Sequence, residues 1–140
     1  MTTVFADARS GVMVCESKCT SDTVWYPMTK IHRVHGELVG IAGTLKEAQA
    51  WLRWYEKGGK GARPKAECFT ALILRKDGKL YEISSDGLDM EVERGFHGVG
   101  SGGGYAVAAF LAGADPRRAV EIACEIDAAS GGEIHVHTLK

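Results

Sequence analysis

Three pairs of short β-type runs, each pair joined by a tight turn, dominate the first 84 residues and restrict what the chain can fold into. The pairs are residues 2–7 with 11–15, residues 30–34 with 37–42, and residues 69–74 with 80–84. The third turn contains Asp77-Gly78, a pair typical of hairpin turns. Strands joined by tight turns run antiparallel, so the chain favours antiparallel sheets over alternating βαβ units.

One helix is predicted between the second and third of these pairs. Thr44 followed three residues later by Glu47 predicts a capping box at its start. Apolar residues then recur at helical spacing as far as Tyr55, and Gly58-Gly59 ends the segment. We expect residues 58–68 to form a loop.

The last third of the sequence adds two helices and two strands. Helical segments are predicted at residues 105–112 and from Asp115-Pro116, where an N-cap residue precedes a first-turn proline. Residues 88–92 predict a short strand and residues 133–139 a closing one. Strands and helices in this order indicate an α+β fold, and we expect a single domain over residues 1–140.

Composition removes several classes of function. The 17 Lys and Arg residues balance 18 Asp and Glu residues, so the basic surface of a nucleic-acid binder is not expected. No apolar run reaches the ~20 residues of a membrane span, and the first residues lack a signal-peptide pattern, so we expect a cytoplasmic protein. Its four cysteines are then expected to be reduced thiols: Cys15, Cys19, Cys68 and Cys124.

Two further patterns are considered as cofactor sites. The loop 98–103 fits the dinucleotide pattern G-x-G-x-x-G, but the parallel strand and terminal acid that this site needs do not follow it. A tight strand-to-helix junction, or a loop lining a site with Ser101, is favoured instead. His135 and His137 share one face of a predicted strand, yet no third ligand is suitably spaced. We therefore expect no metal and no cofactor.

The start of the chain carries the strongest chemical signal. Thr2 follows Met1, and threonine is small enough for removal of the initiator methionine. An exposed N-terminal threonine holds a hydroxyl nucleophile and an α-amine with an ordinary pKa of about 7.7–8.0 on one residue. The amine can accept the hydroxyl proton, so the nucleophile and its base come together.

Six stretches, in order along nearly the whole chain, give this start its context. They are Thr2-Thr3-Val4, residues 11–20, Lys30-Ile31, Ile41-Ala42-Gly43, residues 98–103 and residues 126–132. Together they resemble the proteasome β-subunit family, and especially the bacterial HslV-type peptidases. The resemblance implies a four-layer αββα sandwich of the N-terminal-nucleophile (Ntn) hydrolase type, and a threonine peptidase that acts after Met1 is removed.

The resemblance also implies roles for individual residues. Thr2 matches the nucleophile, Lys30 the lysine beside it, and Glu16 an acidic position that is usually aspartate. Gly43 matches the glycine whose N–H serves the oxyanion hole. Ser101 matches the serine of the glycine-rich loop, and Asp127 and Ser130 match the acid and the serine that support the amine. A cation at Lys30 would lower the pKa of the α-amine by like-charge repulsion, and Glu16 would hold that cation in place.

Substrate and assembly follow as further expectations. The residues that flank these positions are expected to form an apolar specificity pocket: Cys19, Met28, Ile41 and Leu45. The implied partners are an unfolded protein or peptide substrate and further copies of the chain in a homo-oligomer, for which a ring is one arrangement. However, family members usually carry a second long helix where this chain has residues 58–68, and the sequence gives no support for an ATPase unfoldase partner.

Two other functions stay open at this point. The chain could be a proteasome-like subunit that assembles or binds peptides without cutting them. It could also be an amidase that uses the same threonine chemistry on small substrates.

Overall fold

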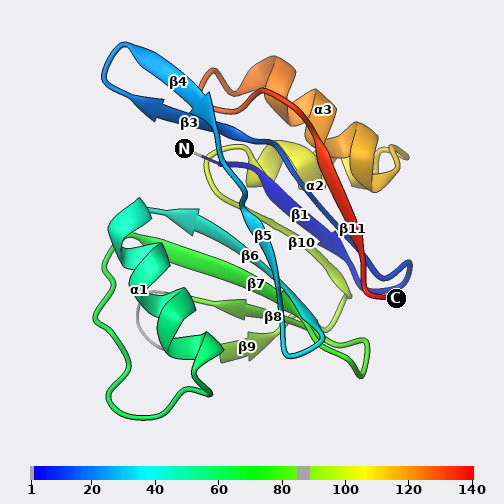
Figure 1. The fold of residues 1–140 in the computed structure, drawn as a ribbon. Coiled ribbons are helices and arrows are strands. Elements are labelled where there is room, and N and C mark those ends of the chain that lie inside the picture. The colour runs from blue at the N-terminus through cyan, green and yellow to red at the C-terminus, as the bar shows by residue number, and fades with distance from the viewer. Residues whose placement is uncertain (1, 85–88) are drawn as a thin grey trace.

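Two antiparallel sheets lie face to face between helices, which gives the molecule four layers (Figure 1). The computed structural model describes residues 2–84 and 89–140. Helix α1 covers the outer face of one sheet, and helices α2 and α3 cover the outer face of the other. The predicted α+β class and its antiparallel hairpins are therefore confirmed.

The first sheet contains both ends of the chain. Its order is β10 (Phe96–Val99), β1 (Val4–Asp7), β2 (Val12–Cys15) and β11 (His135–Thr138). All neighbours pair antiparallel, and the predicted hairpin between β1 and β2 is present. The last strand of the chain, β11, thus forms an edge of the sheet that contains the first two strands.

The second sheet is built from consecutive segments. Its order is β5 (Ile31–Val34), β6 (Glu37–Gly43), β7 (Phe69–Leu74), β8 (Leu80–Ile83) and β9 (Asp89–Glu91). The hairpins β5–β6 and β7–β8 match the predicted pairs. The strand predicted at residues 88–92 is present as β9, while Leu88 lies outside the described residues.

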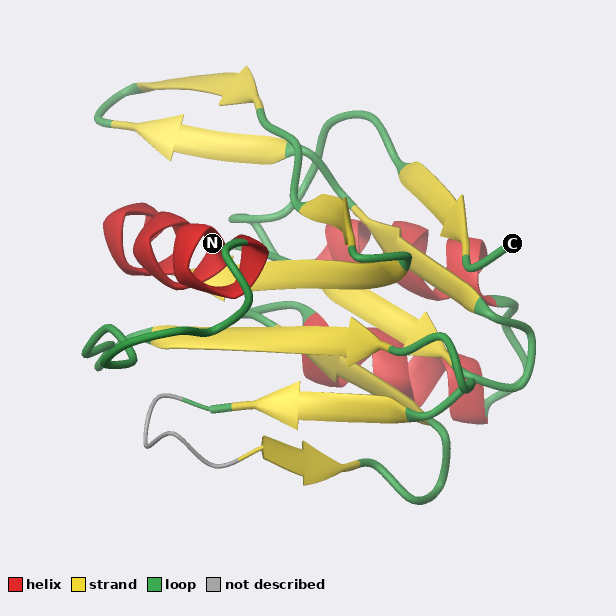
Figure 2. Ribbon diagram, turned by 60° about the horizontal axis from the view of Figure 1, so that its bottom comes forward, coloured by secondary structure: helices red, strands yellow, loops and turns green. Residues whose placement is uncertain are grey.

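A further hairpin was not predicted. Strands β3 (Lys18–Ser21) and β4 (Val24–Pro27) pair only with each other, and Figures 1 and 2 both show them projecting beyond the two sheets. Asp22 occupies the turn with a φ of 55°. The β-forming run Val24-Trp25-Tyr26 was the available signal, although its side chains face solvent instead of a core.

The helices are α1 (Leu45–Glu56), α2 (Gly103–Leu111) and α3 (Pro116–Ile126). Asp115 caps α3 as predicted, since its carboxylate accepts the N–H of Arg118 at 2.8 Å. None of the helices in the described residues has the length and apolar character that a membrane span requires.

The capping box predicted for α1 is wrong. The Thr44 side chain makes no cap hydrogen bond. The Glu47 carboxylate instead accepts the N–H groups of Glu67 and Cys68, at 3.2 and 2.8 Å. Glu47 therefore anchors the end of the loop that leads into β7. Its carboxylate binds these two N–H groups instead of the N–H groups at the start of α1, so no capping box forms.

Alternation along β1 decides what each of its residues meets. Val4 and Ala6 lie in the core between the sheets, with Leu38 and Leu72. Phe5 points the other way and packs under α2 and α3. Because side chains alternate across a strand, Thr2 continues the inner face and Thr3 the face toward the two helices.

Candidate active site

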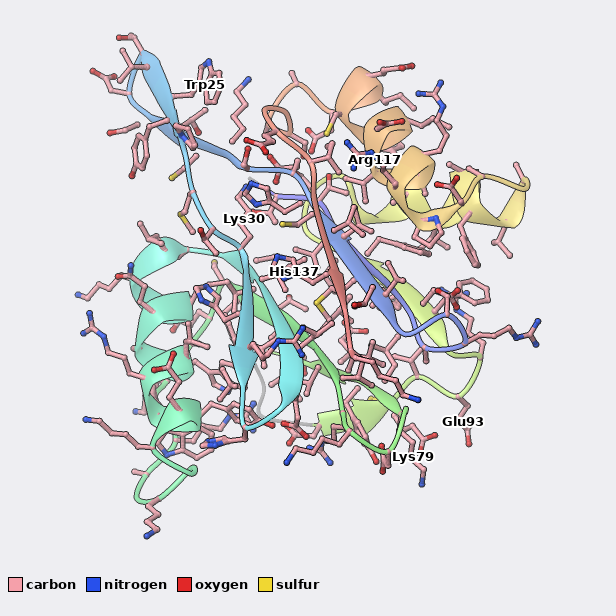
Figure 3. The ribbon with its side chains drawn as sticks, turned by 45° about the vertical axis from the view of Figure 1, so that its right-hand side comes forward. Trp25, Lys30, Lys79, Glu93, Arg117 and His137 are labelled. Atoms are coloured by element: carbon pink, nitrogen blue, oxygen red, sulfur yellow. The ribbon has the colours of Figure 1, made fainter. Side chains whose placement is uncertain are left out.

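Thr2 lies at one end of the space between the sheets, beside Lys30, the residue that immediately precedes β5. The Lys30 ammonium Nζ is 3.3 Å from Thr2 Oγ1, and both side chains are buried. Figure 3 shows Lys30 near the base of the β3–β4 hairpin. The structure thus brings together the hydroxyl and the lysine that the sequence paired.

A buried carboxylate holds Lys30 in this position. Glu16 Oε1 is 2.6 Å from Lys30 Nζ, and neither side chain is more than 2% exposed. Nζ also donates to the backbone carbonyl of Lys18 at 2.7 Å. A surface ion pair contributes little, whereas a buried, hydrogen-bonded pair fixes its partners in one arrangement.

Glu16 also accepts hydrogen bonds from three backbone N–H groups. Oε1 accepts from Thr3 at 3.1 Å, and Oε2 accepts from Lys18 at 2.8 Å and Gly131 at 3.0 Å. With Lys30, four donors offset the cost of burying this carboxylate. Glu16 therefore links the start of the chain, the β2–β3 connection and the segment after α3.

The second cluster lies on the other side of Thr2. The Thr2 backbone nitrogen donates to Ser101 Oγ at 3.3 Å. Ser101 Oγ donates to Asp127 Oδ2 at 2.6 Å, and Ser130 Oγ donates to the same oxygen at 2.7 Å. The sequence could not establish whether Asp127 approaches Thr2, and the structure connects them through Ser101.

These hydrogen bonds favour the ionised form of the Asp127 carboxyl. Partial burial would raise the pKa of the carboxyl, but the donors Ser101, Ser130 and the Ala129 N–H outweigh it and lower the pKa below its ordinary value. Ser130 bonds to Asp127 and to the hydroxyl of Thr3, 2.8 Å away, so its link to Thr2 is indirect.

Gly43, at the end of β6, has its N–H directed toward the same site. The N–H of Thr44 binds Cys68 on the β7 side, and the N–H of Ile41 binds Lys30 on the β5 side. Because backbone N–H groups along a strand point alternately to its two neighbours, the N–H of Gly43 points to the same side as that of Ile41, toward β5. Gly43 lies beyond the residues that pair with β5, so this N–H is directed into the site. Glycine is required here, because φ is +110° and a Cβ would lie 2.1 Å from the Cys68 carbonyl oxygen.

A pocket of about 140 Å³ opens beside Thr2, Lys30 and Gly43. All four residues predicted to form the specificity pocket line it: Cys19, Met28, Ile41 and Leu45. Ala42 and Ala48 add apolar surface, while Lys18 and Thr20 add polar groups. The pocket therefore joins the nucleophile to a mixed wall, in which apolar side chains lie beside polar groups.

The glycine-rich loop packs against the start of the chain. The N–H of Gly102 donates to the Thr2 carbonyl at 3.1 Å. A Cβ at Gly100, where φ is +88°, would lie 2.1 Å from that carbonyl oxygen. Close approach of the loop to the Thr2 backbone therefore accounts for the glycine at position 100, and it carries Ser101 into the site, one of the two interpretations favoured from the sequence.

Sequence reasoning missed Thr3 and Lys18. Thr3 is buried and bonds to both Glu16 and Ser130, and Lys18 supplies a carbonyl to Lys30 and an N–H to Glu16. Alternation along residues 2–7 was the available signal for Thr3. Backbone groups such as those of Lys18 leave no signal in side-chain identity.

Comparisons with known proteins agree on the fold. No protein-family model and no curated protein matches the sequence significantly. Among solved structures, eukaryotic HslV from Trypanosoma brucei matches with a TM-score of 0.77 and 21% identity, covering 97% of this chain and 98% of that one. BPH of Thiobacillus denitrificans in complex with epoxomicin matches with a TM-score of 0.71 and 17% identity, covering 99% of both chains. A second BPH structure gives 0.70 and 17%, covering 99% of this chain and 98% of that one. The chain therefore has the four-layer α+β fold of HslV and BPH, as the resemblance implied.

Proposed function

We propose that the chain is an N-terminal threonine peptidase of the proteasome and HslV kind. The observation that carries the proposal is the position of Thr2 Oγ1, 3.3 Å from the buried ammonium of Lys30 and beside a pocket lined in part by apolar side chains. The shared fold with HslV and BPH supports the same assignment.

The active form requires cleavage of the bond between Met1 and Thr2. Residue 1 lies outside the described residues, so its removal stays a prediction. The Thr2 nitrogen donates a hydrogen bond to Ser101 Oγ, and we expect the free amine to keep this position. Lys30 lowers the pKa of this amine by like-charge repulsion, which keeps more of it as free base at neutral pH.

The first chemical step is attack on a peptide carbonyl. The amine accepts the hydroxyl proton while Thr2 Oγ1 bonds to the carbonyl carbon. The N–H of Gly43 donates to the oxyanion that forms, and one such donor contributes about 2.7–4 kcal/mol to the transition state. Collapse of the intermediate breaks the C–N bond, and the protonated amine gives its proton to the leaving group.

Water completes the reaction. The acyl group is now an ester of Thr2 Oγ1, and the free amine accepts a proton from the attacking water. Ser101 and Asp127 hold the amine in position throughout, because the ionised carboxylate anchors the serine hydroxyl. Hydrolysis releases the acid and restores the threonine.

The pocket indicates the side chain that precedes the cleaved bond. Its walls at Met28, Ile41 and Leu45 are apolar, and Lys30 at its base disfavours a second cation. We infer a preference for peptides, or unfolded protein segments, with uncharged apolar residues at this position.

Fluorogenic peptides and intact-mass measurement test the proposal. We expect the wild-type protein without Met1 to cleave apolar peptides, Thr2→Ala to be inactive and Thr2→Ser to retain activity. Epoxomicin, which is present in a BPH complex, should protect the wild type but not Thr2→Ala in a thermal-shift assay. Loss of Met1 without peptide cleavage would refute the proposal. In that case, turnover of small amides would indicate an amidase and binding alone a non-catalytic subunit.

Exposed apolar side chains support assembly into a homo-oligomer. They gather on the β3–β4 hairpin, at Val24, Trp25 and Tyr26, and on the outer side of α2 and α3, at Tyr105 and Ile126. Such patches are typical of protein interfaces. Light scattering at several concentrations measures the assembly, and a monomer throughout would contradict this part of the proposal.

A further inference from the structure

Thr3 is in contact with both clusters that surround Thr2. Its side chain is fully buried on the opposite face of the strand from Thr2, toward the end of α3. Its backbone N–H donates to Glu16 Oε1 at 3.1 Å, and its carbonyl accepts the N–H of Glu16 at 3.3 Å. The residue after the nucleophile is therefore fixed from both sides.

The direction of each hydroxyl bond follows from counting protons. An ionised Asp127 only accepts, so the single O–H proton of Ser130 is donated to it. Thr3 Oγ1, 2.8 Å from Ser130 Oγ, must then be the donor of that pair. The bonds run from Thr3 to Ser130 to Asp127, while Ser101 donates to the same carboxylate oxygen.

The glycine loop leaves space for this hydroxyl. A Cβ on Gly102 would lie 1.8 Å from Thr3 Oγ1 and 3.2 Å from Asp127 Oδ2. Gly102 has an ordinary φ of −94°, so its backbone conformation does not require glycine. The missing side chain at Gly102 is instead explained by room for the Thr3 hydroxyl.

We propose that Thr3 is a positioning residue, whose hydroxyl orients Ser130 and Asp127 and thereby holds the Thr2 amine and hydroxyl between Ser101 and Lys30. This inference rests on the proposed peptidase function. Thr3 does not touch the substrate. It acts through hydrogen bonds that polarise one another in a chain, which strengthens each of them in a buried setting.

Thr3→Val tests the proposal, because it removes the hydroxyl and keeps the shape. We expect kcat to fall about tenfold with KM unchanged, since small misplacements of a reacting group are costly. Thr3→Ser should restore kcat. The matched control is Thr138→Val, which removes a hydroxyl that bonds to Lys140 at the other end of the molecule, and it should behave as wild type.

An NMR titration of the Asp127 carboxyl gives a readout that does not depend on activity. We expect the pKa of Asp127 to rise in Thr3→Val and to stay at the wild-type value in Thr3→Ser. If Thr3→Val does not fold, Thr3→Ala takes its place, because it removes the hydroxyl without placing a new methyl group against Gly102.

Either of two kinetic results would overturn the proposal: an unchanged kcat in Thr3→Val, or a Thr3→Ser variant as impaired as Thr3→Val. An unmoved Asp127 pKa would also overturn it. If the wild type lacks peptidase activity after Met1 removal, the proposed function fails by itself. The Asp127 titration then decides whether Thr3 orients the cluster.

Discussion

Replacing Lys30 by methionine separates the structural and chemical contributions of this lysine. Methionine keeps the length of the side chain but leaves Glu16, which is fully buried, without its cation at 2.6 Å. Breaking a buried ion pair costs about 3–5 kcal/mol. Three backbone N–H groups still hold the carboxylate, so we expect the low end, about 3 kcal/mol.

Urea unfolding at one fixed protein concentration measures this loss. With a slope of about 2 kcal/mol per molar urea, the midpoint should fall by about 1.5 M without a change in slope. A loss below about 1 kcal/mol would refute the reasoning, because the pair would then behave like an exposed one.

The double variant Glu16→Gln/Lys30→Met provides the decisive comparison. It removes both charges, so we expect it to recover part of the lost stability. The recovery is partial, because an amide offers one acceptor oxygen where the carboxylate offers two to the surrounding N–H groups. Peptide hydrolysis should be absent in Lys30→Met and in the double variant, even where stability is recovered, since neither has a cation at position 30 to lower the pKa of the Thr2 amine. Hydrolysis that returns together with stability would show that Lys30 only supports the fold.

Three further predictions concern other parts of the molecule. Gly102→Ala should destabilise the wild type by steric conflict with Thr3 and cost less in a Thr3→Ala background, which a double-mutant cycle of unfolding free energies measures. Burial lowers the pKa of His32, so below about pH 6.5 the folded state binds fewer protons than the unfolded state. The free energy of unfolding should therefore fall as the pH is lowered from 7.5 to 5.5, and it should fall less in His32→Gln. In a Cys68→Ser background, which removes the exposed thiol, a maleimide on Cys19 should fill the pocket and abolish peptide cleavage, and modified protein that stays active would contradict the assigned pocket.

Local sequence patterns were sufficient where neighbouring residues decide the structure. The Asp77-Gly78 turn and the Asp115 cap involve groups within a few residues of one another, and both are present as predicted. The Thr44 cap failed because Glu47 binds N–H groups 20 and 21 residues away. A pattern that reads only nearby residues cannot include such a competitor.

The candidate site shows the same division. Resemblance to a family proposed Lys30, Glu16, Ser101 and Asp127, which the structure brings around Thr2 from segments as distant in the sequence as residue 127. It did not propose Thr3, since a threonine hydroxyl in a strand has no distinctive spacing. Its role depends on a contact with Ser130, 127 residues along the chain.

Strand alternation predicts that Thr2 and Thr3 face opposite ways, but it leaves open which of them meets Lys30. Packing between the sheets makes that choice. A Cβ at Gly40 would lie 2.5 Å from Val4 Cγ1, so the glycine in β6 admits Val4 to the inner core. With Val4 inside, Thr2 must share its face and Thr3 must turn toward α3. A one-residue slip of β1 would exchange these positions, and the hydroxyl beside Lys30 would then belong to a residue that has no free amine. The register of β1 thus determines which threonine can react.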